Sequence, residues 1–304
     1  MSDQTLPIDL LSPAPLSPPP LLPMTEAELE AYRLHRRFDR MGRLVGDTGM
    51  ARLMNAHVMV IGLGGVGSFV AESLARSGVG KLTLVDFDEI CITNFNRQLH
   101  ALNGRVGEKK AEVMADRLRK INPGAKVTAV VNFYNERLAD EVLVTDRETH
   151  PELVPDLVVD AIDSITSKCH LIDHCRRKGI PILSSMGTGG RMDPSMIRVA
   201  DLAQTTNDSL ARSVRQILRS TYGFPAEGQG HFGVTAVYSM ETPRKPLDLH
   251  YDGGKGFRCV CPQKDNEFFN CDNRSLIWGN ASFLTGAFGL QLASLAVRQI
   301  LGED

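Results

Sequence analysis

Apolar and polar positions alternate between residues 57 and 184 in a way that predicts strands separated by helices. Short apolar runs bounded by turn residues are typical of buried strands, and apolar residues three and four positions apart are typical of helices. Strands are predicted at His57–Gly62, Lys81–Asp86, Lys126–Val131, Asp156–Asp163 and Ile180–Ser184, and helices at Val66–Ser77 and from Ala111 to Ile121. This alternation predicts an α/β fold with a doubly wound, mostly parallel Rossmann-like sheet.

The second half of the chain is less regular. Strands are expected at Met196–Leu202 and Val234–Met240, with a basic helix at Ser209–Ser220 between them and a mostly apolar final helix at Ser282–Leu301. We therefore expect a nucleotide-binding half at about residues 50–190 and a less regular C-terminal extension, a substrate and dimer half, at about 191–304.

The N-terminal segment differs in composition from the rest of the chain. Residues 1–24 are rich in proline, which predicts a disordered tail ahead of one domain at residues 25–304. Thr25 and Glu28 have the spacing of a capping box, so a helix should begin there and run into an arginine-rich stretch. The acidic residues and prolines of the tail are not typical of a secretory signal, and we expect a cytoplasmic protein.

The apolar stretch Leu276–Ile300 raises the question of a membrane span. Its polar residues and internal glycines favour a buried or dimer-interface helix, with membrane association as the alternative. No membrane partner is expected. The net charge of −2 also gives no general attraction to nucleic acid, so any RNA contact must come from local basic patches.

The cysteines indicate reduced thiols rather than a disulfide framework. Cys259, Cys261 and Cys271 lack the paired C-x-x-C spacing of a structural zinc site, and no structural zinc is expected. The sequence leaves the role of these three residues open.

Four glycines between a predicted strand and a predicted helix form a G-x-G-G-x-G loop: Gly62, Gly64, Gly65 and Gly67. Such a loop lets the backbone approach a phosphate, and the helix N-terminus supplies amide donors. Asp86 ends the next predicted strand, where a carboxylate would hold ribose hydroxyls. These features predict a nucleotide site, without deciding between a nicotinamide, a flavin and ATP.

The polar residues that follow favour a triphosphate: Asp88, Asn94, Arg97 and Gln98. Arginine takes phosphate oxygens in a bidentate grip, and a nicotinamide site has no need of such a cluster. The alternative is a polar loop with incidental hydrogen bonds.

Two further residues complete the predicted site. Lys110 lies at a predicted helix start, where its charge would reach the β- or γ-phosphate, unless it is a solvated surface lysine. Asp163 ends a predicted strand, where a carboxylate suits a Mg²⁺ bound with ATP, unless it caps the helix that starts near Ser164.

These motifs resemble the ThiF/MoeB/HesA family, the bacterial relatives of ubiquitin-activating enzymes. The matching elements are Arg37–Arg40, Gly62–Gly67, Asp86–Asp88, Asn94–Gln98, Gly107–Lys110 and Asp163. The resemblance implies a homodimer that binds Mg·ATP and adenylates a carboxylate, with Arg97 and Asp163 in catalytic roles. It also implies that an arginine reaches the partner subunit's ATP. Arginines recur at helical spacing in the stretch before the first predicted strand. Among them Arg40 is favoured for this contact with ATP, with Arg37 and Arg43 as rivals.

Within the family, the chain resembles the branch that dehydrates threonylcarbamoyladenosine next to the tRNA anticodon. The similar segments are Asn94–His100, Gly107–Met114, Ala161–Ser164, Cys175–Pro181, Gly187–Pro194 and Val199–Leu202. The resemblance implies that ATP adenylates the threonyl carboxylate and that intramolecular ring closure releases AMP, without an enzyme nucleophile. The alternative is adenylation of the C-terminal glycine of a ubiquitin-like sulfur carrier. A cysteine desulfurase/SufE-like sulfur acceptor system is a further expected partner.

Arginines at spacings of three and four follow one side of the predicted helix Ser209–Ser220: Arg212, Arg215 and Arg219. Phosphate contacts from this stripe would give tRNA affinity that depends on salt and not on base sequence. A solvated helix face is the alternative explanation.

Overall fold

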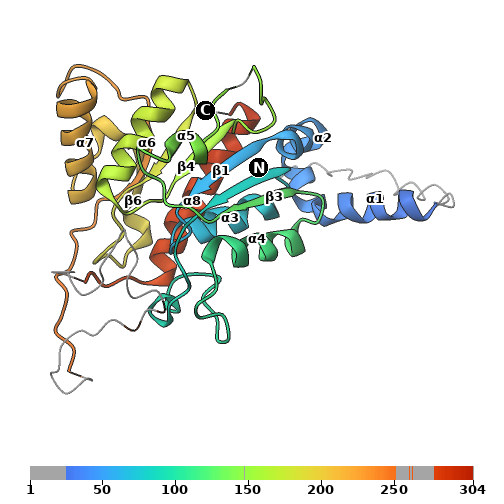
Figure 1. Cartoon of the computed structure of the whole chain (residues 1–304), viewed down its shortest axis with the longest axis horizontal. Helices are drawn as coiled ribbons and strands as arrows, with labels where there is room; N and C mark the ends of the chain where they lie inside the picture. Colours follow the sequence, from blue (N-terminus) through green and yellow to red (C-terminus); the bar gives the residue numbers. More distant parts are fainter. Residues whose placement is uncertain (1–24, 147, 251–259, 261, 263–276, 304) are drawn as a thin grey trace, which may run out of the picture. The chain divides into compact units, whose positions relative to one another are not determined.

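The computed structural model describes residues 25–146, 148–250, 260, 262 and 277–303 (Figure 1). It divides into two compact units, Met1–Arg37 and Phe38–Asp304. In the first unit, helix α1 (Glu26–Arg37) begins at the predicted capping box. The Thr25 amide donates to Glu28 Oε2 over 2.8 Å, and the Glu28 amide donates to Thr25 Oγ1 over 3.3 Å. The tail predicted at residues 1–24 lies outside the described residues.

The second unit is built on one seven-stranded sheet with the order β3-β2-β1-β4-β5-β7-β6. Neighbouring strands run parallel except for β6 and β7, which pair antiparallel. The strands are β1 (His57–Ile61), β2 (Lys81–Val85), β3 (Lys126–Val130), β4 (Leu157–Asp160), β5 (Ile182–Ser185), β6 (Ile197–Asp201) and β7 (Thr235–Ser239). This sheet confirms the predicted doubly wound α/β class.

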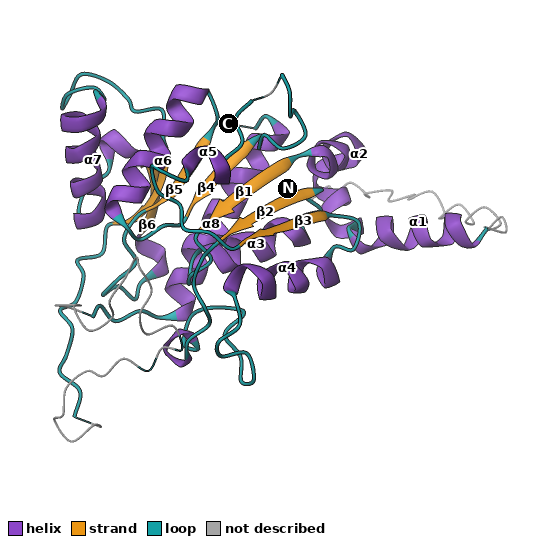
Figure 2. Ribbon diagram, viewed as in Figure 1, coloured by secondary structure: helices purple, strands orange, loops and turns teal. Residues whose placement is uncertain are grey.

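Helices cover both faces of the sheet (Figure 2). The helices of this unit are α2 (Asp39–Asn55), α3 (Gly67–Arg76), α4 (Lys110–Ile121), α5 (Ala139–Val142), α6 (Ile165–Lys178), α7 (Ser209–Tyr222) and α8 (Ser282–Leu301). Short 3₁₀ helices are η1 (Ile92–Asn94), η2 (Pro194–Met196) and η3 (Leu202–Gln204). Helix α3 packs against α4 and α8, and α6 packs against α7.

Helix α8 is long and apolar enough to cross a membrane, and half of its most apolar window is buried inside the protein. Its glycines explain the burial, because a Cβ on Gly289 would lie 2.6 Å from the Val66 carbonyl oxygen and one on Gly286 3.1 Å from the Phe69 ring. The absence of side chains there lets α8 lie directly on α3. The side of the predicted helix that faces α3 is thus buried, while a dimer interface and membrane association stay untested predictions for its exposed side.

Two sequence predictions need correction. Strand β4 ends at Asp160 and not at Asp163, because the Asp160 carboxylate accepts the Ile162 amide over 3.0 Å and turns the chain out of the sheet. The predicted arginine stripe is also interrupted. Helix α1 ends at Arg37, α2 begins at Asp39, and the boundary between the two compact units falls between them.

Candidate active site

The carboxyl ends of β1, β2 and β4 meet at one edge of the sheet. Ile61, the last residue of β1, pairs with Val85 of β2 and with Asp160 of β4. The Gly62 amide donates to the Val85 carbonyl and the Ala161 amide donates to the Ile61 carbonyl, each over 2.9 Å. Three sequence-predicted segments therefore leave the sheet side by side, where ligands of doubly wound folds bind.

The glycine loop is packed too tightly for side chains at most of its positions. Gly62 has a φ of +89°, and a Cβ on it would lie 2.7 Å from the Ala161 carbonyl oxygen. A Cβ on Gly67 would lie 1.8 Å from the Gly62 oxygen, and one on Gly65 3.2 Å from the Arg97 side chain. Gly64 is different, since its Cβ would meet only Gln98, at 3.9 Å. The loop therefore presents bare backbone beside Arg97 and Gln98, as a phosphate cradle requires.

Asp86 holds this loop in place. Its buried carboxylate accepts the Leu63 amide over 2.6 Å and the Asp88 amide over 2.8 Å. These two bonds fix the glycine loop against the segment that follows β2. Sequence reasoning assigned Asp86 to the ribose hydroxyls, and that assignment stays a prediction. The structure adds a positioning function through the backbone.

Lys110 is buried rather than solvated, with 5% of its surface exposed. Its ammonium donates to Asp88 Oδ2 over 2.6 Å from the first turn of α4. Burial by itself lowers the pKa of Lys110, but the charges of Asp86, Asp88 and Asp163 outweigh it and raise the pKa overall. Lys110 thus stays protonated among these carboxylates. Lys109 instead pairs with Glu89 over 3.0 Å, so Lys110 is the phosphate candidate of the two.

Two predicted site residues at and after η1, Asn94 and Arg97, have different roles in the structure. Asn94 is buried, and its side-chain oxygen accepts the Cys91 amide over 2.9 Å, which caps η1. Arg97 is half-buried, and its Nη1 donates to the Thr93 carbonyl and to Asn96 Oδ1, each over 2.9 Å. The Arg97 guanidinium is therefore held above the glycine loop, while Asn94 shapes the segment that carries it.

Two buried polar side chains near the loop have atoms without a hydrogen-bond partner among the residues that the structure describes: Gln98 at Oε1 and His100 at both ring nitrogens. Burial, followed by the charges of Lys110 and Arg117, lowers the pKa of His100 to about 3, so this ring is neutral at physiological pH. Buried polar atoms normally bond to protein, water or ligand. Gln98 Oε1 therefore lacks the partner that a water or a bound molecule would normally supply.

Asp163 is exposed on the loop between β4 and α6 and forms no hydrogen bond with the described part of the chain. It does not cap α6, whose N-cap is Ser164. Within the described residues, no group of three or more His, Cys, Asp or Glu side chains could hold a metal ion. A single carboxylate still fits Mg²⁺ bound together with phosphates, because Mg²⁺ usually keeps waters and takes only one or two protein carboxylates.

A buried ion pair beneath this loop was missed by sequence reasoning. Lys168 Nζ lies 2.6 Å from Asp160 Oδ2, and neither side chain is exposed to solvent. Ser184 donates to the same oxygen over 2.5 Å, and Lys168 also donates to the Ser185 carbonyl over 3.0 Å. The network anchors the turn that presents Asp163. A lysine within a helix gives no sign in the sequence that it points inward.

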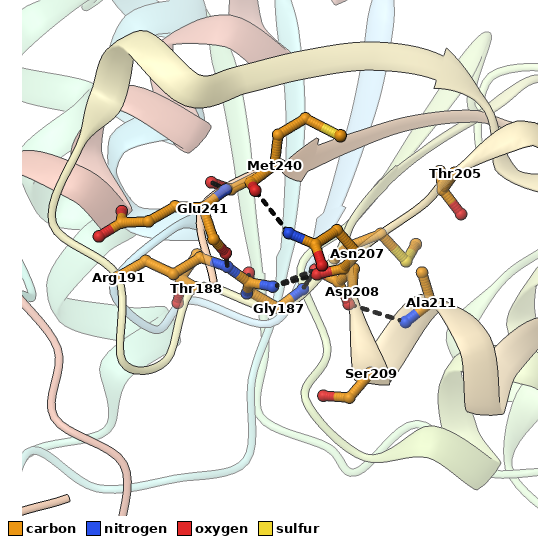
Figure 3. Close-up of polar contacts among 12 residues, drawn as sticks. Gly187, Thr188, Arg191, Thr205, Asn207, Asp208, Ser209, Ala211, Met240 and Glu241 are labelled. Atoms are coloured by element: carbon orange, nitrogen blue, oxygen red, sulfur yellow. Dashed lines mark hydrogen bonds and ion pairs between the residues drawn. The ribbon is translucent and has the colours of Figure 1, made fainter. Parts of the chain in front are cut away.

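A second buried network centres on Arg191, which is 3% exposed (Figure 3). Its guanidinium donates to the Gly187 carbonyl, donates to the Asn207 carbonyl over 3.1 Å and pairs with Asp208 over 3.4 Å. Asp208 accepts the Gly187 amide over 3.1 Å and caps α7 by accepting the Ala211 amide over 2.9 Å. The glycine run that begins at Gly187 is thus tied to the start of α7.

Some predicted features remain untested. Cys259, Cys261 and Cys271 lie outside the described residues, so the expectation about zinc stays a prediction. Arg40 is exposed on α2, and Arg43 pairs with Asp39 over 3.1 Å. Which arginine reaches a partner subunit's ATP also stays a prediction.

Replacing Gly67 by alanine should weaken ATP binding at least tenfold, because the new Cβ would force the Gly62 carbonyl and the glycine loop to move. Gly42→Ala is the matched control, since its Cβ would meet only Met50, at 3.6 Å. Calorimetric titration with ATP measures the difference. Equal affinity in the two variants would remove the loop from the ATP site.

The chain is similar to known proteins over most of its length. The ThiF family model matches residues 38–304. The tRNA threonylcarbamoyladenosine dehydratase of Escherichia coli K12 is 38% identical over 274 residues, which covers 90% of this chain and 96% of the relative. A crystal structure of the E. coli dehydratase TcdA in complex with ATP aligns with a TM-score of 0.73 and 35% identity, over 92% of this chain and 98% of that one.

Another relative, an adenylyltransferase, matches a smaller part of the chain. The molybdopterin-synthase adenylyltransferase of Salmonella typhimurium LT2 is 35% identical over 145 residues, only 48% of this chain and 54% of the relative. Similarity to the dehydratases instead extends over nearly the whole length of both chains. The chain therefore belongs to the ThiF family, within its tRNA threonylcarbamoyladenosine dehydratase branch.

Proposed function

We propose that this protein catalyses the ATP-dependent dehydration of threonylcarbamoyladenosine next to the tRNA anticodon. The observation that carries the proposal is the cluster of Arg97, buried Lys110 and exposed Asp163 around a bare glycine loop, at one edge of the sheet. Such a cluster provides positive charge for phosphates and one carboxylate for a cation. The chain-long similarity to dehydratases, one of them solved with ATP, supports the substrate.

The reaction has two steps. An oxygen of the threonyl carboxylate attacks the α-phosphorus of ATP, and pyrophosphate leaves. The carbamoyl oxygen then attacks the activated carboxyl carbon, a carbamoyl N–H proton is lost, and AMP departs with one carboxylate oxygen. The product has lost one water relative to the substrate. The second step is intramolecular, so correct positioning supplies much of the rate.

The protein groups act mainly through charge and orientation. Lys110 and Arg97 would neutralise phosphate oxygens, which makes the α-phosphorus easier to attack and pyrophosphate easier to release. Mg²⁺, held by Asp163 together with the phosphates, would supply further charge neutralisation. The Gly62–Gly67 loop would keep the phosphates in register through its backbone amides.

The oligomeric state, the location in the cell and the partners of the protein are also proposals. We propose a cytoplasmic homodimer in which Arg40 of one subunit reaches the ATP of the other, with Arg37 and Arg43 as rivals. No membrane partner is proposed, and the burial of half of the apolar window of α8 supports this. A cysteine desulfurase/SufE-like sulfur acceptor system stays a prediction of the family resemblance.

The test supplies ATP, Mg²⁺ and tRNA that carries threonylcarbamoyladenosine, and follows AMP release together with the mass of the digested nucleoside. We expect RNA-dependent AMP and a loss of about 18 daltons, the mass of the one water that intramolecular ring closure removes. The control contains tRNA without the modification. AMP formation with a ubiquitin-like carrier protein, and none with the modified tRNA, would favour the sulfur-carrier function instead.

A further inference from the structure

Helix α7 carries a hollow of about 550 Å³ on its surface, outside the nucleotide site. The hollow is lined by Arg212, Arg215, Gln216, Arg219, Ser220 and Glu227. Three guanidinium groups therefore face a single carboxylate, and that carboxylate is 93% exposed and 3.9 Å from the Arg219 guanidinium. The hollow has an excess of positive charge that the described protein does not balance.

The three arginines keep most of their donors free for a ligand. A guanidinium has five N–H donors. Arg215 donates to Thr205 Oγ1, and Arg219 donates to the Pro225 carbonyl over 3.2 Å. Arg212 is exposed, and its side chain forms no hydrogen bond or ion pair with the described residues. Hydrogen bonds thus orient Arg215 and Arg219 in advance, while the Arg212 side chain remains open to a ligand.

The arginines also raise one another's electrostatic energy. Burial, followed by the charge of Arg219, lowers the pKa of Arg215, and the charge of Arg212 acts in the same direction. An anion in the hollow would relieve this repulsion. From Arg212 to Arg219 the helix rises by about 10 Å, enough to meet more than one phosphate of a single RNA strand.

The hollow is connected to the active-site edge of the sheet. The cap of α7, Asp208, holds the Gly187 amide, and Gly187 follows the end of β5. Arg191 braces the same junction (Figure 3). The stripe therefore begins within one helical turn of a loop at the carboxyl end of the sheet, the end that carries the ATP site.

We infer that the hollow on α7 is a docking site for the phosphate backbone of the RNA substrate. The inference rests on the proposed function for the identity of the RNA, and the hollow itself supplies no base recognition. Arginine binds phosphate in a bidentate manner, so the contacts would be independent of base sequence and sensitive to salt. They would hold the tRNA while its modified nucleoside enters the adenylation site.

The experiment measures the affinity of the full-length protein for modified tRNA at several salt concentrations. Arg212→Glu should weaken binding about tenfold and reduce the slope of log affinity against log salt by about one. Glu227→Gln should tighten binding about twofold to threefold, because Glu227 is the one carboxylate among the described residues that line the hollow. In turnover, Arg212→Glu should raise the KM for tRNA more than it lowers kcat.

Lys120→Glu is the matched charge-reversal control. Lys120 is exposed on α4, which packs on β3, at the edge of the sheet opposite to β6 (Figure 1). The affinity of the Lys120→Glu variant for tRNA should stay within about twofold of wild type, since Lys120 meets no phosphate in the proposed complex. Equal losses in Lys120→Glu and Arg212→Glu would overturn the inference, as would unchanged binding in Glu227→Gln. Should Arg212→Glu fail to fold, Glu227→Gln decides alone.

The two proposals can fail separately. If wild type releases AMP with tRNA and Arg212→Glu binds tRNA as tightly as the Lys120→Glu control, the docking site is wrong and the proposed function is supported. If tRNA binding depends on Arg212 but no AMP forms, the docking site stands and the function falls.

Discussion

Asp163→Ala should lower RNA-dependent AMP release about a thousandfold while the protein stays folded. A carboxylate that positions a phosphate-bound cation contributes several kcal/mol to the transition state, and each 1.4 kcal/mol is about tenfold in rate. The side chain is exposed and forms no hydrogen bond with the described residues, so the fold does not depend on it. Initial rates of AMP and pyrophosphate release at increasing Mg²⁺ concentration measure the effect.

Asp116→Ala provides the matched control for this experiment. Its side chain is 66% exposed on α4 and forms only a surface ion pair with Arg119. Activity within about twofold of wild type is expected, because such pairs contribute little. Thermal unfolding of both variants should match wild type. If Asp163→Ala keeps its rate at saturating Mg²⁺, Asp163 does not belong to the site.

Lys168→Met should lower the free energy of unfolding by about 3–5 kcal/mol, because it leaves the Asp160 carboxylate buried and uncompensated. Both side chains are fully buried and 2.6 Å apart. Unfolding in urea, followed by circular dichroism, measures the loss. A surface control, Arg105→Met, removes an ion pair whose side chains are 45% and 42% exposed, and should cost less than about 1 kcal/mol.

The double variant Lys168→Met/Asp160→Asn separates an ion-pair effect from a packing effect. It removes both charges, and Asn can still accept the Ile162 amide, so part of the stability should return. Equal stability of the single and double variants would show that lost packing, rather than an unpaired charge, causes the change.

The two networks that position the candidate site illustrate the limit of sequence reasoning. Lys168 and Asp160 are eight residues apart, and Ser184 is a further sixteen from Lys168. Arg191 pairs with Asp208 and donates to the Glu241 carbonyl, and these residues lie far apart in the sequence. From the sequence, the charged side chains of both networks could equally have been solvated. Charge and spacing along the chain do not indicate which face of a helix or strand is buried. Only the packing of α6 and β5 on β4 makes Lys168 a buried partner of Asp160.

The sequence by itself determined the parallel sheet, the glycine loop, the α1 capping box, the final helix and Lys110 at the start of α4. Each depends on a local pattern: alternation of apolar residues, conformational freedom at glycine, or a side chain that bonds to backbone a few residues away. The tertiary structure alone decided where β4 ends, that the arginine stripe breaks at Phe38, and that three arginines of α7 share one hollow. These features depend on which distant segments are brought together, because burial and charge balance are properties of the packed chain.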